Sequence, residues 1–195
     1  GSEGDDSLFG DVDDDVIFGN QGNDIGNGSV GNDSILGGDG DDCLDGGTGD
    51  DTIFGENDND TLYGYIGSDF INGNRGDDQI FGGGNTDNLR GGKGDDTISG
   101  EQENDSLFGD LNDDQVIGGF GDDTLFGGKD NDTLQGSEGN DSLLGDRGND
   151  ILFGEAGEDT LTGGEGSDTF VLPGELGNID VINDFNPLED FLALS

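Results

Sequence analysis

The hydrophobic positions of this chain recur every nine residues from Gly1 to Val171. Cut at that period, the sequence gives 19 units without insertion or deletion, and the eighth residue is Leu, Ile, Val or Phe in 18 of them. Only Gly26 breaks this row. Nine residues advance an α-helix by about 900°, which would place successive eighth residues on opposite faces. The pattern therefore excludes a helix and indicates a coil of short strands and turns.

Each unit divides into a strand-forming part and a turn-forming part. The seventh to ninth residues are β-branched, aromatic or aliphatic, as in Thr52-Ile53-Phe54 and Thr124-Leu125-Phe126. Alternation along such a strand places the eighth residue inside and its neighbours outside. The first to sixth residues are rich in Gly, Asn and Asp, which favour turns. We therefore predict one three-residue strand and one turn per unit.

Three positions of the turn are restricted in residue type. The first is glycine and the sixth is aspartate in all 19 units, and the fourth is glycine in 13. Five of the six exceptions at the fourth position are Asn or Asp, which best tolerate a positive φ angle; they are Asp13, Asp58, Asn85, Asn112 and Asp130. The remaining exception is Glu103, where we expect a strained or altered loop.

The sixth-position aspartates are predicted to stack. If two units form one turn of a flattened coil, residues 18 apart lie at the inter-strand spacing of about 4.8 Å. Asp42 then lies over Asp60, and Asp60 over Asp78. Two carboxylates about 5 Å apart repel by roughly 3 kcal/mol at an effective dielectric constant of 20. The repeat of this repulsion along both edges predicts a divalent cation between the loops.

Calcium fits these loops best, because it accepts six or more oxygen ligands in flexible geometry, whereas magnesium demands a strict octahedron. With no histidine and one cysteine, Cys43, the chain offers few ligands for zinc, copper or iron and no internal disulfide. A solvated Asp-Gly turn would explain one aspartate, but not 19 aspartates at the same position of the repeat. The candidate metal ligands are Asp6, Asp15, Asp24, Asp33, Asp42, Asp51, Asp60, Asp69, Asp78, Asp87, Asp96, Asp105, Asp114, Asp123, Asp132, Asp141, Asp150, Asp159 and Asp168. We expect the fifth-position residues to support the turns through side-chain hydrogen bonds instead.

Composition agrees with a metal-dependent fold. The chain of 195 residues has 43 glycines and is only 27% apolar, so its core must be thin. Its 48 acidic and 5 basic residues give a formal charge of −43, which without a counter-ion is typical of a disordered chain. The same charge disfavours nucleic acids and anionic membranes, and the longest apolar run, Phe191 to Leu194, is too short to span a bilayer. We therefore expect calcium ions as partners, and neither nucleic acid nor membrane insertion.

The units resemble the GGxGxDxUx nonapeptide of the RTX (repeat-in-toxin) family of secreted haemolysins, proteases, lipases, epimerases and adhesins; examples are Gly37-Gly38-Asp39-Gly40-Asp41-Asp42-Cys43-Leu44-Asp45 and Gly91-Gly92-Lys93-Gly94-Asp95-Asp96-Thr97-Ile98-Ser99. The resemblance covers residues 1–171. It implies an all-β, right-handed parallel β-roll of two short-stranded sheets. Rows of calcium ions lie between its turns, each held by sixth-position carboxylates and backbone carbonyls of two loops 18 residues apart. It also implies type I secretion to the outside of the cell as part of a larger protein.

The segment after the last repeat resembles the family's C-terminal tail, which closes the roll. The chain is thus expected to comprise nineteen repeats over 1–171 and a capping segment over 172–195. Two roles for this segment remain open from the sequence. It either completes the last calcium sites through Asp180, Asp184 and Asp190, or caps the core through Val181, Ile182, Phe185 and Leu192.

Three classes of function are compatible with such a module. The first is a structural module that folds when it binds calcium outside the cell. The second is a surface-binding or adhesin module that contacts a carbohydrate or protein through outward aromatic residues at the ninth position, although these residues could simply cover the strands. The third, an enzyme, is not expected, because the chain has no histidine and no serine in a nucleophile elbow. The aromatic residues are Phe9, Phe18, Phe54, Tyr63, Phe81, Phe108, Phe126 and Phe153.

Overall fold

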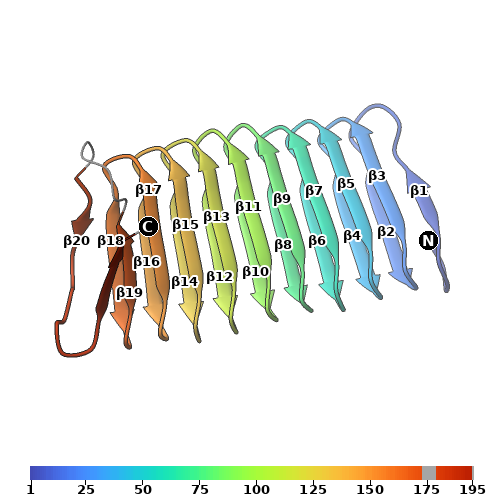
Figure 1. Ribbon diagram of the computed structural model, residues 1–195. Helices are drawn as coiled ribbons and strands as arrows, with labels where there is room; N and C mark the ends of the chain where they lie inside the picture. Colours follow the sequence, from blue (N-terminus) through green and yellow to red (C-terminus); the bar gives the residue numbers. More distant parts are fainter. Residues whose placement is uncertain (173–178, 195) are drawn as a thin grey trace.

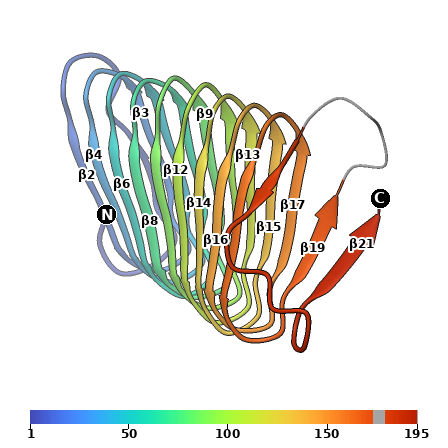
Figure 2. The ribbon, with the colours of Figure 1, turned by 90° about the vertical axis from the view of Figure 1, so that its left-hand side faces the viewer.

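The computed structural model describes residues 1–172 and 179–194 as two parallel β-sheets that face each other (Figure 1). Successive strands alternate between the sheets, so the chain winds as a β-solenoid, whose stacked loops are visible in Figure 2. Every regular element of these residues is a strand, as predicted. None of the described segments forms a helix of the length and apolar character that a membrane span requires.

The strands of both sheets follow the repeat. The ten-stranded sheet consists of β2 (Val16–Gln21), β4 (Ser34–Asp39), β6 (Thr52–Asn57), β8 (Phe70–Arg75), β10 (Asn88–Lys93), β12 (Ser106–Leu111), β14 (Thr124–Lys129), β16 (Ser142–Arg147), β18 (Thr160–Glu165) and β20 (Val181–Ile182). The eleven-stranded sheet consists of β1 (Ser7–Phe9), β3 (Ile25–Val30), β5 (Cys43–Thr48), β7 (Thr61–Ile66), β9 (Gln79–Gly84), β11 (Thr97–Gln102), β13 (Gln115–Phe120), β15 (Thr133–Glu138), β17 (Ile151–Ala156), β19 (Thr169–Leu172) and β21 (Phe191–Leu194).

Strand pairing confirms that two units form one turn. Leu89 of β10 lies opposite Leu107 of β12, and the same 18-residue register holds from β1 to β19. The strands are longer than predicted, because β2 to β18 each have six residues instead of three. They continue through the first three residues of the next unit, although the second of these has a positive φ, +87° at Glu56 and +71° at Tyr65. The turn proper is therefore limited to the fourth to sixth residues.

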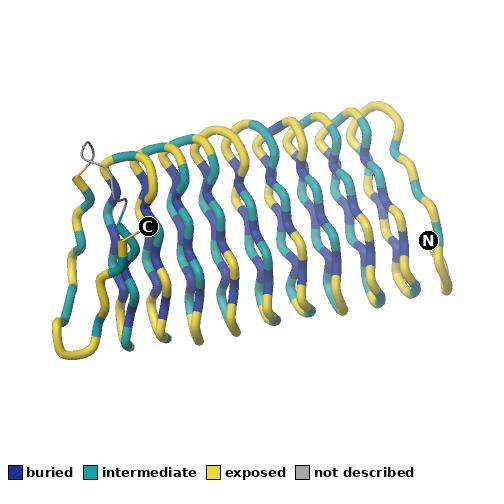
Figure 3. The backbone as a smooth tube through the Cα atoms, in the orientation of Figure 1, coloured by how far each residue is buried: buried dark blue, intermediate teal, exposed yellow. Residues whose placement is uncertain are grey.

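The eighth residues form the core, as the hydrophobic pattern predicts. They come alternately from the two sheets and form one hydrophobic cluster, and they are among the buried positions drawn dark blue in Figure 3. None is more than 7% exposed from Ile17 to Phe170. At Gly26, the break in the row, an added Cβ would lie 3.0 Å from Leu44 Cδ2, so the next layer fills the space. From β4 to β18 each strand contributes only this one residue to the core, which agrees with the low apolar content.

The fourth residue of the unit takes the left-handed conformation that the residue types at this position predict. The φ angles of the five Asn and Asp residues at this position range from +73° at Asp58 to +83° at Asn112. Glu103 adopts φ +69°, so its loop keeps the common shape instead of an altered one. Because a Cβ-bearing side chain without Asn or Asp character is uncommon at positive φ, the strain expected at Glu103 is present.

The tail extends both sheets by one strand each. β20 pairs with β18 and β21 pairs with β19, both in parallel orientation. The ring of Phe185 contacts that of Phe170 edge-on at 6.1 Å between centroids. Phe185 and Ile182 pack against the last layers of the core. Of the predicted capping segment, residues 173–178 and 195 lie outside the described residues.

Candidate functional site

The sixth-position aspartates form a hydrogen-bonded ladder along each edge of the solenoid. The N–H of Asp60 donates to Oδ1 of Asp78 at 2.8 Å, and the carbonyl oxygen of Asp60 accepts the N–H of Gln79 at 2.8 Å. The same N–H to Oδ1 contact recurs from Asp6 to Asp168. The structure therefore brings all 19 predicted residues into two regular rows. The two rows fix Oδ1 of every sixth-position aspartate from Asp24 to Asp168.

The other oxygen, Oδ2, is buried without a hydrogen-bond donor over nearly the whole ladder. The side chains from Asp24 to Asp168 are at most 3% exposed, while Asp6 and Asp15 at the first turn are half-buried. A buried polar atom without a partner destabilises a fold, and a buried charge more so. Within the described residues, Oδ2 is unpartnered in Asp15, Asp24, Asp33, Asp42, Asp51, Asp60, Asp69, Asp78, Asp87, Asp96, Asp105, Asp114, Asp123, Asp132, Asp141, Asp150 and Asp159.

The first-position glycine leaves the space that this oxygen occupies. A Cβ added to Gly19 would lie 2.3 Å from Asp24 Oδ2 and 2.4 Å from the carbonyl oxygen of Gly37. A Cβ on Gly91 would lie 2.2 Å from Asp96 Oδ2. The carboxylate oxygen thus faces the space beside the glycine. At Gly19, a carbonyl oxygen from the unit 18 residues on faces the same space. Such a set of hard oxygen donors fits calcium.

In the absence of a cation, burial disfavours the charged form of these carboxylates. Desolvation is the main cause that raises the pKa of Asp96 to about 8, with further contributions from neighbouring Asp78 and Asp77. The N–H bond to Oδ1 acts in the opposite direction but is weaker. Desolvation likewise raises the pKa of Asp60 to about 8 and that of Asp51 to about 7. Without a cation, the site therefore competes for protons near neutral pH.

The fifth-position residues play the supporting role expected of them. The N–H of Asp95 donates to Oδ1 of Asp77 at 3.0 Å, and the N–H of Asn149 donates to Oδ1 of Asn131 at 3.0 Å. These side chains are exposed. In their hydrogen bonds the donor N–H lies 18 residues after the acceptor, whereas at the sixth position it lies 18 residues before the acceptor. They join adjacent loops without burying an oxygen.

Two of the three tail aspartates continue the ladder. Asp180 Oδ1 accepts the N–H of Asp159 at 3.3 Å, and Asp190 Oδ1 accepts the N–H of Asp168 at 3.1 Å. At Asp190, however, Oδ2 accepts the N–H of Asn186 at 2.7 Å. The sequence signal for this continuation is an aspartate two residues before an apolar one, as in the repeats.

Asp184 instead caps a strand. Its two oxygens accept the N–H groups of Gly163 and Gly164 at 3.0 and 2.9 Å. Of the four apolar residues predicted to cap the core, Ile182 and Phe185 pack against it, whereas Val181 and Leu192 are more than half exposed.

Backbone carbonyl oxygens, which the resemblance to the RTX family implies as ligands, leave only an indirect signal in the sequence. The described residues contain no cluster of three or more His, Cys, Asp or Glu side chains suited to a metal ion. Backbone carbonyl oxygens are the further hard oxygen donors that these loops offer to a cation such as calcium. The glycine present at the first position of every unit was the available signal, since it keeps the backbone open to the aspartate.

Comparison with known sequences gives one result. The RTX calcium-binding nonapeptide repeat matches the chain in nine overlapping blocks, from residues 1–26 to residues 135–170, which together cover 1–170. No curated protein matches the chain significantly.

The raised pKa values predict that acid partly replaces the cation. Because the folded aspartates have pKa values above 3.8, the folded chain binds more protons than the unfolded chain between about pH 4 and pH 8. Stability of the metal-free chain must then increase as pH falls through this window. We expect far-ultraviolet circular dichroism of the metal-free protein to show more β structure at pH 5 than at pH 8. The opposite order, or equal spectra, would contradict this reading of the buried oxygens.

Proposed function

This chain belongs to the family of RTX calcium-binding nonapeptide repeats, and from that premise we propose that it is a structural module that folds when calcium binds. The observation that carries the proposal is the row of buried, unpartnered Oδ2 atoms. The folded chain concentrates negative charge where water does not reach it. Calcium removes this penalty in the folded state only, so its binding free energy becomes folding free energy.

The ligands we propose are the sixth-position carboxylates and the backbone carbonyls beside them. Each aspartate already touches the loop 18 residues before it through Oδ1, as Asp78 does with Asp60. An ion held by Oδ2 would therefore act on two loops at once. Such coupling between neighbouring turns makes folding of a solenoid cooperative.

The cellular setting follows from the charge. A chain with a formal charge of −43 and 27% apolar residues is poorly suited to fold without a counter-ion. We propose that it stays unfolded where calcium is scarce, is exported through a type I channel in that state, and folds outside the cell within a larger secreted protein. Proteins with such repeats are typically secreted, which supports this setting.

The repeat family is structural rather than catalytic, and the outer aromatic side chains agree with a structural role. The rings of Phe108 and Phe126 stack at 4.8 Å and 1°, and those of Tyr63 and Phe81 at 5.1 Å and 10°. Most of these side chains are half-buried against their neighbours. This packing supports the interpretation that they cover the strands.

We further propose that the chain divides into repeats over 1–171 and a cap over 172–195. The last turns of a solenoid expose backbone groups and core side chains, and a differing terminal segment commonly covers them. Support comes from β20 and β21, which pair with the last strands, and from Phe185, which packs on Phe170.

Calcium-driven folding is tested by a titration followed by circular dichroism. We expect coil in chelator and a cooperative gain of β structure in millimolar calcium. Asp78→Asn retains an oxygen acceptor for Asp60 but loses the charge, so the calcium midpoint should rise by about tenfold or more. The matched control is Asp77→Asn, which removes the same charge from the exposed neighbour and should shift the midpoint little. Full β structure in chelator, or equal shifts in both variants, would refute the proposal.

The cap is tested by a chain that ends at Val171. This chain keeps every repeat loop, so a model without a cap predicts an unchanged calcium midpoint. If residues 172–195 cover the open end, the truncated chain should need several-fold more calcium or associate through its exposed edge. Calcium titration and light scattering of both chains decide the question. Superimposable curves from two monomeric samples would exclude a capping role.

A further inference from the structure

All five Lys and Arg residues of this acidic chain lie on one sheet. Arg75 ends β8, Lys93 ends β10, Lys129 ends β14 and Arg147 ends β16, while Arg90 lies within β10. These strands, with β12 between them, form one continuous part of the ten-stranded sheet. They contain five cations and only two carboxylates, Asp110 and Asp146. These five strands thus carry an excess of positive charge, although the chain carries −43 overall and the turns that follow them contain carboxylates such as Asp95 and Asp130.

Four of the cations stand in one line across the strands. Arg75 is in register with Lys93, and Lys129 is in register with Arg147. Leu111 lies between Lys93 and Lys129. We call this line, Arg75, Lys93, Leu111, Lys129 and Arg147, the cationic column. Its four charged residues are exposed, and each lies one or two strands from the next.

Internal stability does not explain the cationic column. Like charges directly opposite each other on neighbouring strands are destabilising. Acidic residues, of which the chain has 48, would pair favourably with these cations but do not stand opposite them within the cationic column. Arg147 pairs with Glu165 at 3.4 Å, but both side chains are exposed. Among the described residues, Arg75, Lys93 and Lys129 form no ion pair. An external anion would relieve this repulsion.

A groove runs beside the cationic column. It has a volume of about 590 Å³ and is lined by residues that include Arg90, Asp110, Leu111, Lys129 and Arg147. Gly92 and Gly128 at the second position leave it open on either side of Asp110.

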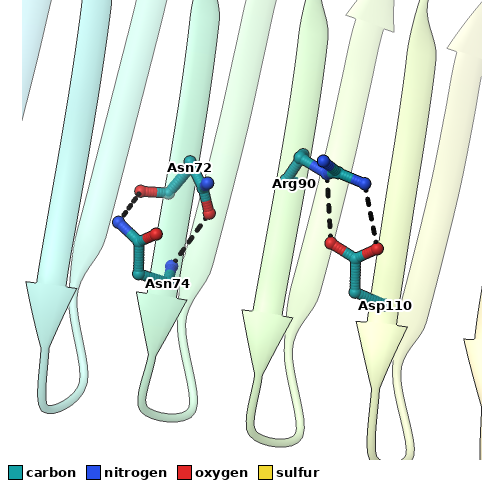
Figure 4. A network of polar contacts seen from close by, with 4 residues as sticks. All are labelled: Asn72, Asn74, Arg90 and Asp110. Atoms are coloured by element: carbon teal, nitrogen blue, oxygen red, sulfur yellow. Dashed lines mark hydrogen bonds and ion pairs between the residues drawn. The ribbon is translucent and has the colours of Figure 1, made fainter.

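The wall of the groove is held rigid. Arg90 contacts Asp110 through Nε at 3.1 Å and through a terminal nitrogen at 3.1 Å, as Figure 4 shows. Its guanidinium also lies 5.0 Å above the ring of Phe108, whose ring stacks on Phe126. The groove thus combines an ion pair with apolar surface next to exposed cations.

We propose that the cationic column and its groove bind an acidic polysaccharide in extended conformation, lying across the strands. The strand spacing of about 4.8 Å is close to the length of one pyranose residue in an extended chain, so carboxylate or sulfate groups of a chain that crosses the strands can meet the cations of β8, β10, β14 and β16. Leu111 contacts the apolar faces of the sugar rings, and Asp110 and Asp146 accept their hydroxyl groups. At the ionic strength of a cell exterior, charges act over about 8 Å, so a bound polymer responds to the charges beside it and not to the net charge of the whole chain.

Two other polyanions fit less well. The acidic side chains on one face of a peptide strand recur at about 6.8 Å, which does not match the strand spacing. A single-stranded nucleic acid requires exposed ring faces on which its bases stack. Here one face of Phe108 is covered by Arg90 and the other by Phe126.

The test measures binding of the calcium-saturated chain to dextran sulfate by calorimetry, with unsulfated dextran as the neutral partner of the same backbone. The variant Arg75→Gln, Lys93→Gln, Lys129→Gln removes the three cations without an ion pair. The matched control, Thr48→Glu, Gln102→Glu, Ala156→Glu, changes the charge equally at third positions of the other sheet. We expect about tenfold or greater loss of affinity in the first variant and less than about twofold in the second.

Several outcomes would overturn the proposal. They are the absence of binding to dextran sulfate, equal binding of unsulfated dextran, and equal losses in the two variants, which would indicate an effect of net charge alone. Tighter binding of polyglutamate or of a thymidine oligonucleotide would assign the surface to a different polymer. An unchanged calcium midpoint in both variants separates these results from a failure of folding.

Discussion

The structure depends on seventeen buried carboxylate oxygens that no donor within residues 1–172 and 179–194 reaches. From Asp24 to Asp168 the ladder of N–H groups satisfies only Oδ1 of the aspartates, and the first-position glycine lets Oδ2 approach the backbone. Burial then raises the pKa of these groups, to about 8 at Asp96. The fold therefore contains, in every turn, a local instability that protons or a cation must remove. Calcium is the cation indicated by the family to which the chain belongs.

This constraint explains why the chain has few other sources of stability. Its core is formed by eighth-position side chains, and its turns consist largely of glycine, Asn and Asp. In place of a thick core, the chain repeats one contact in which an aspartate joins two loops 18 residues apart. The outer faces are then free to vary, and the cations gathered on the ten-stranded sheet show that one face departs from the acidic character of the rest.

Much of this arrangement was predictable because the repeat is strict. The period placed Leu107 inside and Asp60 over Asp78, and the Asn and Asp residues at the fourth position indicated positive φ. The length of the strands was not predictable, because Tyr65 and Glu56 adopt positive φ while the next residue stays paired. The tail was predictable only in part, since the spacing changes there from 18 to 21 and 22 residues and the pattern no longer fixes each contact.

The central claim is that cations lie against the buried Oδ2 atoms. The most direct test is a crystal structure of the chain grown in calcium, with anomalous scattering used to locate the ions. The account predicts anomalous peaks at about 2.3–2.6 Å from Oδ2 of the sixth-position aspartates, recurring along both edges at the strand spacing of about 4.8 Å. Peaks confined to exposed carboxylates such as Asp77, with Oδ2 of Asp78 and Asp96 still unpartnered, would contradict it.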